Sequence, residues 1–424
     1  MFRRPDVPSS RPSEPQDVLL TRTRSGSEVP VFGRHDEQTL KQLDDVASRA
    51  ERAALMADGH VGYVMPIGGV AAYHNAVSVV GVGFDIACGN AAIRTDKSVQ
   101  DFDRRGWSAI ADEIAATVSF GIGRSNRADD APTDHPLFED DAWDALPDKE
   151  RTPLKTKARA QLGTVGSGNH YVDVFADETG AVWVGVHFGS RGLGHTIASG
   201  FLALSQDKPW GEHVREAEVL LDLDSPIGHD YWELMNLAGR YAYAGREWVT
   251  RKVVSILGGR ELELVHNHHN FAWKEVHAGE ELVVVRKGAT PAFPGQLSFV
   301  GGSMGDDSVI LRGASGDTRE QRAALYSTVH GAGRVMSRTE ARGKINRKTG
   351  EVKSRGAISR AMLEQWIGEK NVILRGGGVD EAPQVYRRLR DVLGAQGSTI
   401  DVVHTLRPIV VVMAGEKEFD PYKD

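Results

Sequence analysis

The chain of 424 residues has a single cysteine, Cys88, so no internal disulfide bond can hold its fold together. It also has no apolar run long enough to span a bilayer, and its first residues, MFRRPDVPSSRPSEPQD, lack the apolar core of a signal peptide. We therefore expect a protein of the reducing cytoplasm. Positive charge is not in excess, because 51 Lys and Arg stand against 58 Asp and Glu. A polyanionic partner would need a local basic patch.

What the chain does contain is the composition of a large globular protein, with 40% hydrophobic and 26% charged residues. Apolar spacing predicts helices over residues 35–51, 99–118 and 231–257. Residues 61–85, rich in Gly and Val, indicate short buried strands and tight turns, and strands are also expected over 281–292 and 308–313. Because helices and strands do not alternate regularly, we predict an α+β fold. We expect one large domain over 18–424, with mixed sheets, surrounding helices and glycine-rich active-site loops, after a flexible tail over 1–17.

Two segments have charge of mainly one sign. Residues 129–150 hold nine Asp or Glu and one Lys, which predicts a solvated loop. Residues 338–360 hold eight Lys or Arg and two Glu, the one strongly basic stretch. This stretch is either a path for a polyanion or a solvated loop, and its composition does not decide between the two.

Several of the 15 histidines follow apolar runs and lie among Gly, Ser or Asn: His170, His187, His195, His266, His268, His269 and His330. Cys88 lies in the similar context GVGFDIACGN, three places after Asp85. A carboxylate, a thiolate and dispersed imidazoles are a plausible ligand set for a transition metal, and one thiolate could bridge two ions. Alternatively, Cys88 is a small buried apolar residue and the histidines belong to turns and the core.

Four glycine-rich loops, GSGN, GSRG, GGSMG and HGAGR, offer free backbone N–H groups that could bind phosphates. None has the Gly-Lys-Ser/Thr ending of a P-loop or the GxGxxG pattern of a dinucleotide site. They are therefore either ordinary turns or parts of an uncommon nucleotide pocket.

Taken together and in order, these motifs resemble the RtcB family, RNA ligases that join a 3′-phosphate or 2′,3′-cyclic phosphate end to a 5′-hydroxyl. The resemblance is carried by MADGHVGYVMPIGGV (56–70), GVGFDIACGN (81–90), LGTVGSGNHYVDV (162–174), HFGSRGLGH (187–195), HHNF (268–271), RKGATPA (286–292), GGSMG (301–305), HGAGRVMSR (330–338), DEAPQVY (380–386) and LRPIVVVMAG (406–415). It covers most of the chain.

The resemblance implies a centre of two manganese ions, bridged by the cysteine. The implied metal ligands are Asp85, Cys88, His170, His187 and His269. It also implies that His330 is the nucleophile, which attacks GTP and carries GMP as a phosphoramidate. The GMP would then pass to the RNA 3′-phosphate before the 5′-hydroxyl attacks.

The implied GTP-binding residues lie in the glycine-rich loops and around them. They are Asn169, His170, Tyr171, Val172, Asp173, His269, Asn270, Gly301, Gly302, Ser303, Met304, Ser308, His330, Gly331, Ala332, Gly333 and Tyr386. Lys287 and Arg338 could add positive charge or lie at the surface. The expected partner is RNA, such as tRNA halves or damaged RNA, with residues 338–360 as a candidate path. An archease-like activator is a further partner that the resemblance suggests.

The chain departs from the family pattern at four positions. Asp173 stands where the family usually has the Glu that reads guanine, and Ala414 where many members have a base-contacting Lys, with Lys417 as a candidate substitute. Gly301 replaces Pro in the PGSM loop, and Phe188 places a bulky ring beside a ligand. The metal and nucleophile set stays complete, whereas guanine selectivity is left open, as in a divergent paralogue.

Three functions remain for test. The first is a GTP- and manganese-dependent RNA ligase acting in tRNA splicing or RNA repair. The second is a metal-dependent phosphoesterase that acts on terminal or cyclic RNA phosphates without nucleotidylation and so does not need His330. The third is an RNA-binding paralogue without turnover, which would not need Cys88.

Overall fold

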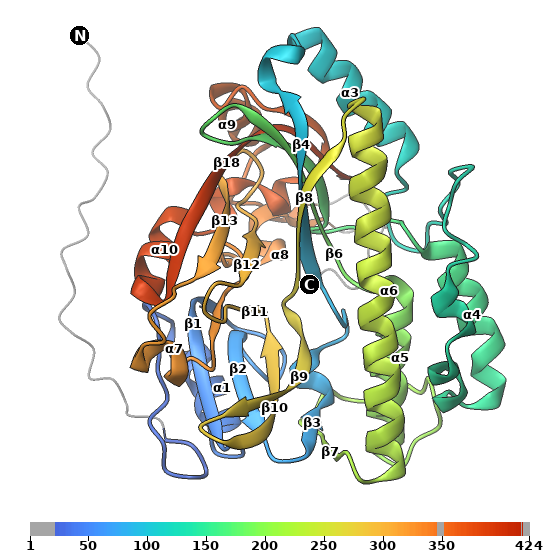
Figure 1. Ribbon diagram of the computed structural model, residues 1–424, viewed down its shortest axis with the longest axis vertical. Helices are drawn as coiled ribbons and strands as arrows, with labels where there is room; N and C mark the ends of the chain where they lie inside the picture. The colour runs from blue at the N-terminus through green and yellow to red at the C-terminus, as the bar shows by residue number, and fades with distance from the viewer. Residues whose placement is uncertain (1–21, 346–351, 417, 419–424) are drawn as a thin grey trace.

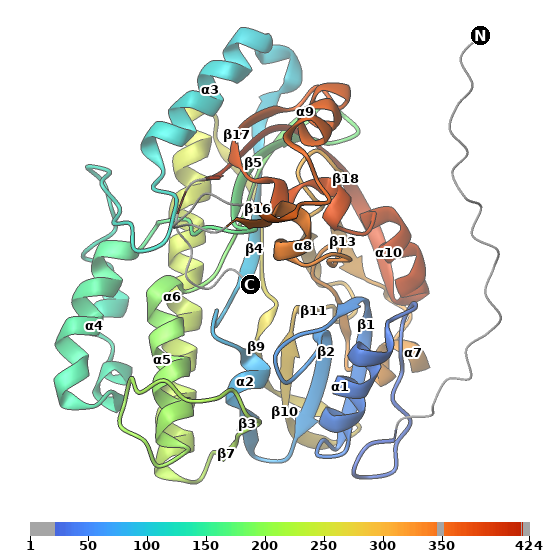
Figure 2. The same cartoon turned by 180° about the vertical axis from the view of Figure 1, so that it is seen from behind.

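The computed structural model describes residues 22–345, 352–416 and 418. The predicted tail over 1–17, residues 346–351 of the basic stretch, and Lys417 lie outside the described residues. Figures 1 and 2 show two main sheets, one above the other in these views, flanked on one side by long helices. The predicted α+β class is confirmed.

The larger sheet has eight strands in the order β12-β13-β18-β5-β6-β4-β8, with β17 paired to β18 off this path. Its pairings are antiparallel except for the parallel pair β17–β18. Its strands are β4 (Gly89–Ser98), β5 (Tyr171–Ala176), β6 (Ala181–Phe188), β8 (Glu261–His268), β12 (Leu297–Val300), β13 (Ser308–Gly313), β17 (Ile373–Gly377) and β18 (Ile400–Gly415).

The smaller sheet is an antiparallel set of four strands in the order β1-β2-β10-β9. Its strands are β1 (Arg52–His60), β2 (Ile67–Tyr73), β9 (Asn270–His277) and β10 (Glu280–Lys287). Three short antiparallel pairs complete the described strands: β3 (Ala76–Ser78) with β7 (Leu220–Asp222), β11 (Ala289–Pro291) with β14 (Ser327–Val329), and β15 (Gly343–Ile345) with β16 (Val352–Arg355). The strands predicted over 281–292 and 308–313 are thus confirmed.

The long helix predicted over 231–257 is confirmed as α6, which packs against β4 and β6. The Ser225 side chain caps its N-terminus, and Pro226 supplies a first residue with a preset φ. The helices are α1 (Glu37–Ala47), α2 (Val79–Val82), α3 (Arg104–Thr117), α4 (Asp148–Gln161), α5 (Arg191–Leu204), α6 (Pro226–Ile256), α7 (Arg319–Ala323), α8 (Arg338–Arg342), α9 (Arg360–Glu369) and α10 (Leu389–Gln396). Within the described parts of the chain, no helix is long and apolar enough to cross a membrane.

The prediction of a solvated loop over 129–150 is wrong for its second half. Residues Pro136–Glu139 and Asp141–Ala145 form 3-10 helices, and α4 begins at Asp148. Phe138 and Trp143 are buried in the same core as Tyr241 of α6. The apolar anchors outweigh the surrounding negative charge, because burying one large aromatic ring contributes on the order of 2 kcal/mol.

The two sheets meet where β8 of the larger sheet leads into β9 of the smaller one. His269 is the single residue between these two strands. In the larger sheet, Gly89 at the start of β4 pairs with Phe188 at the end of β6 and with His268 at the end of β8. Tyr171 at the start of β5 pairs with His187. Antiparallel register therefore brings one end of four neighbouring strands together.

Candidate active site

The junction of the two sheets opens into a cavity of about 1480 Å³. The strand ends that meet there carry Cys88 before β4, His187 near the end of β6, His170 before β5 and His269 after β8. These residues are far apart in sequence but close in space, because the end of one antiparallel strand lies beside the start of its neighbour. The register of the larger sheet is therefore what assembles the cluster.

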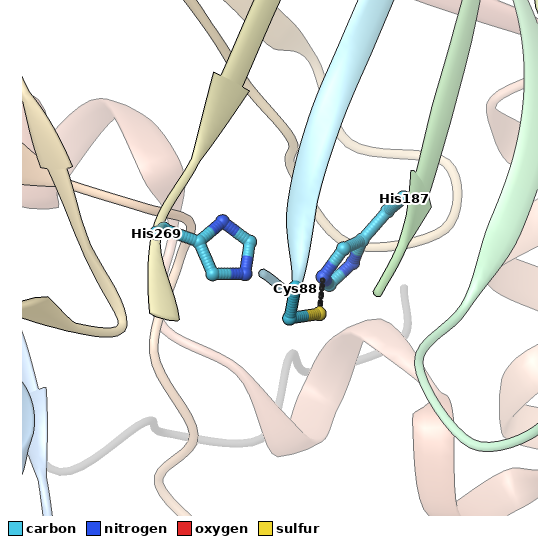
Figure 3. A group of neighbouring side chains, drawn as sticks. All are labelled: Cys88, His187 and His269. Carbon is cyan, nitrogen blue, oxygen red and sulfur yellow. Dashed lines mark hydrogen bonds between the residues drawn. The ribbon is translucent and has the colours of Figure 1, made fainter. Parts of the chain in front are cut away.

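Cys88, His187 and His269 form the first group of potential ligands (Figure 3). The Sγ atom of Cys88 lies 3.3 Å from Nε2 of His187, and all three ligand atoms lie within 4.8 Å of one another. The His187 and His269 rings are 5.1 Å apart between centroids. All three residues are buried. One cation placed among these atoms could contact all of them.

Asp85, Cys88 and His170 form a second group, whose ligand atoms also lie within 4.8 Å of one another. Nε2 of His170 lies 3.1 Å from Oδ2 of Asp85 and 3.7 Å from Sγ of Cys88. Burial raises the pKa of Asp85, but the hydrogen bond and charge of His170, together with Arg191, lower that pKa to about 2. Cys88 belongs to both groups, so its sulfur could serve as a ligand in each of them.

Two glycines allow the ligand-bearing segments to approach this closely. A Cβ atom on Gly89 would lie 2.2 Å from the carbonyl oxygen of Asn267, and one on Gly189 would lie 2.1 Å from Oδ1 of Asp85. Neither distance is tolerable for a real side chain. Glycine is therefore required next to Cys88 and two residues after His187.

The donor set fits a transition metal. Burial lowers the pKa values of His187 and His269 well below the ordinary value, so both imidazoles are neutral and able to coordinate. Nδ1 of His269 is buried and has no hydrogen-bond partner among the described residues. Burial and the Asp85 carboxylate raise the pKa of the Cys88 thiol, so a bound cation would have to displace its proton.

His330 lies at the edge of this cluster, with its ring centroid 4.9 Å from that of His269. Its Nδ1 atom is 2.6 Å from Oδ2 of Asp58, a completely buried carboxylate in β1. The same oxygen accepts the backbone N–H groups of His330 and Gly331 at 3.0 and 3.3 Å. Burial raises the pKa of Asp58, but the charge and hydrogen bonds of His330 outweigh it, so the pKa lies below its ordinary value.

Sequence reasoning did not single out Asp58. The only signal was its place in the segment MADGHVGYVMPIGGV, where a carboxylate interrupts an otherwise small and apolar strand. A charged group in a buried strand needs a partner, and this one is supplied 272 residues later. The contact holds Nδ1 of His330 against β1, and His330 lines the cavity.

Most of the predicted nucleotide-binding residues line the same cavity. Those that do are Asn169, His170, Tyr171, Asp173, His269, Asn270, Gly301, Gly302, Ser303, Met304, His330, Gly331, Ala332, Gly333 and Tyr386. Two do not line it. Val172 points to the opposite face of β5 and is buried in a hydrophobic core, because alternate residues of a strand face opposite sides. Ser308 lies behind the Gly301–Met304 loop, where its Oγ accepts the backbone N–H of Gly302.

Asp173 and Tyr171 project from β5 into the cavity with unused polar atoms. Oδ1 of Asp173 and the hydroxyl of Tyr171 are buried and have no hydrogen-bond partner among the described residues. Burial raises the pKa of Asp173 well above its ordinary value. A Cβ atom on Gly301 would lie 2.1 Å from the Tyr171 hydroxyl, so glycine at 301 and tyrosine at 171 depend on each other. These groups suit a polar, planar ligand.

Three cations near the cavity, Lys287, Arg334 and Arg338, are held by protein groups. Nζ of Lys287 donates to the carbonyl oxygen of Val80, and burial lowers the pKa of Lys287 to about 8. Arg338 forms an ion pair with Glu381. Arg334, also a lining residue, pairs with Glu381 and donates to the Tyr386 hydroxyl.

The structure shows where two of the residues that depart from the family pattern, Phe188 and Ala414, lie. Phe188 points away from the ligands into the core under α6, because it alternates with His187 along β6. In β18, Val411 and Met413 line the cavity, whereas Ala414 is a buried residue that does not. His266 and His268 likewise lie off the ligand groups and contact Arg246.

Comparison with known proteins gives one consistent result. The family described as tRNA-splicing ligase RtcB matches residues 39–414. The chain is 32% identical to RNA-splicing ligase RtcB of Escherichia coli K12 over 386 aligned residues, covering 85% of this chain and 89% of that protein. It is 31% identical to tRNA-splicing ligase RtcB of Thermococcus kodakarensis, covering 88% and 91% of the two chains. The corresponding protein of Archaeoglobus fulgidus is 32% identical, with 90% and 92% covered.

Proposed function

The chain belongs to the RtcB family of RNA-splicing ligases, and from that premise we propose how this RNA ligase works. It joins RNA 3′-phosphate or 2′,3′-cyclic phosphate ends to 5′-hydroxyl ends, with GTP as the energy source and two Mn²⁺ ions, in tRNA splicing or RNA repair in the cytoplasm. The observation that carries the proposal is the Asp58–His330 pair beside the two ligand groups that share Cys88.

The two ligand groups are the proposed manganese sites. Cys88, His187 and His269 would hold one ion, and Asp85, Cys88 and His170 the other. When bound, the ions supply Lewis-acid stabilisation of negative charge on phosphate oxygens. The protein contributes a setting in which His187 and His269 are neutral and Asp85 is ionised, as the directions of their pKa values indicate.

His330 is the proposed nucleophile. Nδ1–H of His330 donates a hydrogen bond to the Asp58 carboxylate, so the lone pair at Nε2 is the one that attacks the α-phosphorus of GTP. A bond from Nε2 to phosphorus forms as the bond from phosphorus to the pyrophosphate oxygen breaks. The imidazole gains positive charge during this step, and the Asp58 carboxylate stabilises that charge through the hydrogen bond at Nδ1.

Two further displacements complete the reaction. An oxygen of the RNA 3′-phosphate attacks the guanylate phosphorus, and the bond from phosphorus to His330 breaks. The 5′-hydroxyl oxygen of the second RNA end then attacks the activated 3′-phosphorus; it loses its proton, and GMP leaves. A 2′,3′-cyclic phosphate would first be opened by water to give the 3′-phosphate.

The proposed base site is the end of the cavity formed by Tyr171 and Asp173. Their unpartnered polar atoms can hydrogen-bond to the edge of guanine, whose N1–H donates and whose O6 accepts. The Gly301–Met304 loop and the Gly331–Gly333 segment line the same cavity and would lie against the ribose and phosphates. The N–H groups of Gly302 and Gly331 are held by Ser308 and Asp58, which fixes the shape of both segments.

A sealing assay tests the proposal. One RNA strand ends in a 3′-phosphate, the other begins with a 5′-hydroxyl, and the protein is supplied with GTP and Mn²⁺. Sealing by the unaltered protein and its loss in His330→Ala support the ligase. Release of inorganic phosphate or cyclic-phosphate opening in both proteins, without sealing, would instead identify the phosphoesterase.

A further inference from the structure

The side chain of Arg246, on the inner face of α6, is completely buried and forms four hydrogen bonds. Its Nη1 group donates to the carbonyl oxygens of Ala87 and Phe188 at 2.9 and 2.6 Å. Its Nε group donates to Nε2 of His266 at 2.8 Å, and its Nη2 group lies 2.8 Å from Nδ1 of His268. One guanidinium thus joins helix α6 to three separate segments of the larger sheet.

Three of these four acceptors, Ala87, Phe188 and His268, are each adjacent in sequence to a proposed metal ligand. Ala87 immediately precedes Cys88, Phe188 immediately follows His187, and His268 immediately precedes His269. Cys88, His187 and His269 are the three members of the first ligand group. Fixing the carbonyl or ring of an adjacent residue restrains the backbone from which each ligand projects. Through these hydrogen bonds Arg246 therefore contacts a sequence neighbour of every ligand in that group. It forms no such bond with the ligands themselves.

The protonation states of the partners suit this arrangement. Burial and the charge of Arg246 lower the pKa of His266 to about 3 and the pKa of His268 well below its ordinary value, so both rings are neutral and can accept. Burial lowers the pKa of Arg246 only to about 10, which leaves it charged at neutral pH. The Tyr243 ring stacks on His268 with centroids 3.9 Å apart and holds that ring in place.

Burying the Arg246 guanidinium lowers the free energy of unfolding unless its interactions compensate for the lost hydration. Removing a guanidinium from water costs several kcal/mol, which close hydrogen bonds offset only in part. None of the four acceptors carries a charge, so Arg246 gains no ion pair from them. A planar fork with several fixed donors is, however, suited to holding several acceptors at set positions.

We propose that Arg246 is a positioning residue that holds the chain segments carrying Cys88, His187 and His269 in the arrangement a metal ion requires. The inference rests on the proposed metal site and extends it to a residue that contacts neither the metal nor the substrate. If Arg246 had a purely structural role, substituting it would lower the stability of the chain but leave the metal affinity of the folded protein unchanged.

Cobalt(II) is the probe for the test, because its visible bands and thiolate charge-transfer absorption report ligand geometry without any RNA or nucleotide. Arg246→Lys keeps the charge and loses the planar fork. We expect it to fold, to bind Co²⁺ roughly 10- to 100-fold more weakly, and to show a weakened thiolate absorption. Arg251→Lys, in the same helix but exposed and paired with Glu247 and Glu261, is the matched control and should bind as the unaltered protein does.

A second pair of variants decides the matter if Arg246→Lys does not fold. His268→Leu removes one acceptor, whereas His268→Asn places an amide oxygen near the position of Nδ1. We expect His268→Leu to weaken Co²⁺ binding and His268→Asn to restore most of it. Folded variants that all bind Co²⁺ with unaltered affinity and spectrum would overturn the positioning role. Absence of Co²⁺ and Mn²⁺ binding by the unaltered protein would instead overturn the proposed metal site and this inference with it.

Discussion

Oδ2 of Asp58 lies 2.6 Å from Nδ1 of His330 and also accepts the backbone N–H groups of His330 and Gly331. One buried carboxylate oxygen therefore fixes both the ring and the backbone of the proposed nucleophile. The contact joins β1 of the smaller sheet to the segment after β14. Nδ1 is the ring nitrogen that the contact occupies, so in the proposed reaction Nε2 is the nucleophilic atom.

We expect Asp58→Asn to reduce guanylylation of His330 by roughly 10²- to 10⁴-fold, the usual contribution of a positioned acid or base. An amide cannot balance the positive charge that develops on the imidazole, and its NH₂ group can favour the wrong tautomer. Single-turnover formation of the covalent adduct measures the effect. Asp96→Asn, which removes only an exposed ion pair with Arg260, should react normally. An unaffected Asp58→Asn rate would refute the role given to this carboxylate.

Substituting Cys88 should reduce the number of bound metal ions more than substituting a histidine of either ligand group. Because Cys88 belongs to both ligand groups, Cys88→Ala should lose tight binding of both Mn²⁺ ions. His269→Ala and His170→Ala each disturb one group and should retain about one ion per chain. Metal content after dialysis, measured by mass spectrometry, gives the stoichiometry. Two tightly bound ions in Cys88→Ala would show that the thiolate does not bridge them.

Gly89→Ala should destabilise the protein by about 1–3 kcal/mol and weaken metal binding. The added Cβ would lie 2.2 Å from the carbonyl oxygen of Asn267, so β4 and β8 would have to separate next to Cys88. Gly394→Ala is the control, because it lies in helix α10 with no atom within 4 Å of the added Cβ. That substitution should stabilise the chain by up to about 1 kcal/mol. Denaturant midpoints compare the two.

Glu275 should make folding stability depend on pH. Burial raises the pKa of Glu275, but the charges and hydrogen bonds of Arg286 and His277 lower it by more. The folded pKa therefore lies below the ordinary value of 4.5. Its contribution is therefore complete above about pH 4.5 and is lost as the pH falls through the folded pKa.

Glu275→Gln tests this dependence. We expect it to lose about 3–5 kcal/mol at neutral pH, because Arg286 is completely buried and would be left unpaired. The difference from the unaltered protein should shrink below pH 4.5, where the glutamate of the unfolded chain becomes protonated, until the pH reaches the lower pKa of the folded state. Denaturant midpoints across this pH range measure it, and a difference that stays constant down to the lowest pH would contradict the account.

The sequence predicted those features that are encoded locally. Apolar spacing over 231–257 was sufficient to find α6, since a long amphipathic pattern is decided by its own residues. The prediction of a solvated loop over 129–150 was wrong because Phe138 and Trp143, two residues among many charges, determine the burial of that segment. Charge counts describe a surface, whereas a few aromatic rings decide whether a segment packs.

The site divides in the same way. Asp85, Cys88 and seven histidines were singled out by their local motifs, and the family resemblance reduced the histidine ligands to His170, His187 and His269. The structure places these three with Asp85 and Cys88 in two ligand groups. Asp58 was not found because its partner His330 lies 272 residues away. Arg246 was not found because its acceptors lie in three segments, 20 to 159 residues away along the chain. Val172 was placed in the pocket although it faces the core, since a motif does not say which face of a strand is turned inward.

The most direct test of the central claim is the covalent attachment of guanylate to His330. The purified protein is incubated with Mn²⁺ and GTP labelled at the α-phosphate, denatured, and examined for bound label, alongside ATP and the His330→Ala variant. The account predicts acid-labile label from GTP that survives denaturation and is absent from His330→Ala. No label from either nucleotide in protein that has bound Mn²⁺, or label that persists in His330→Ala, would contradict it.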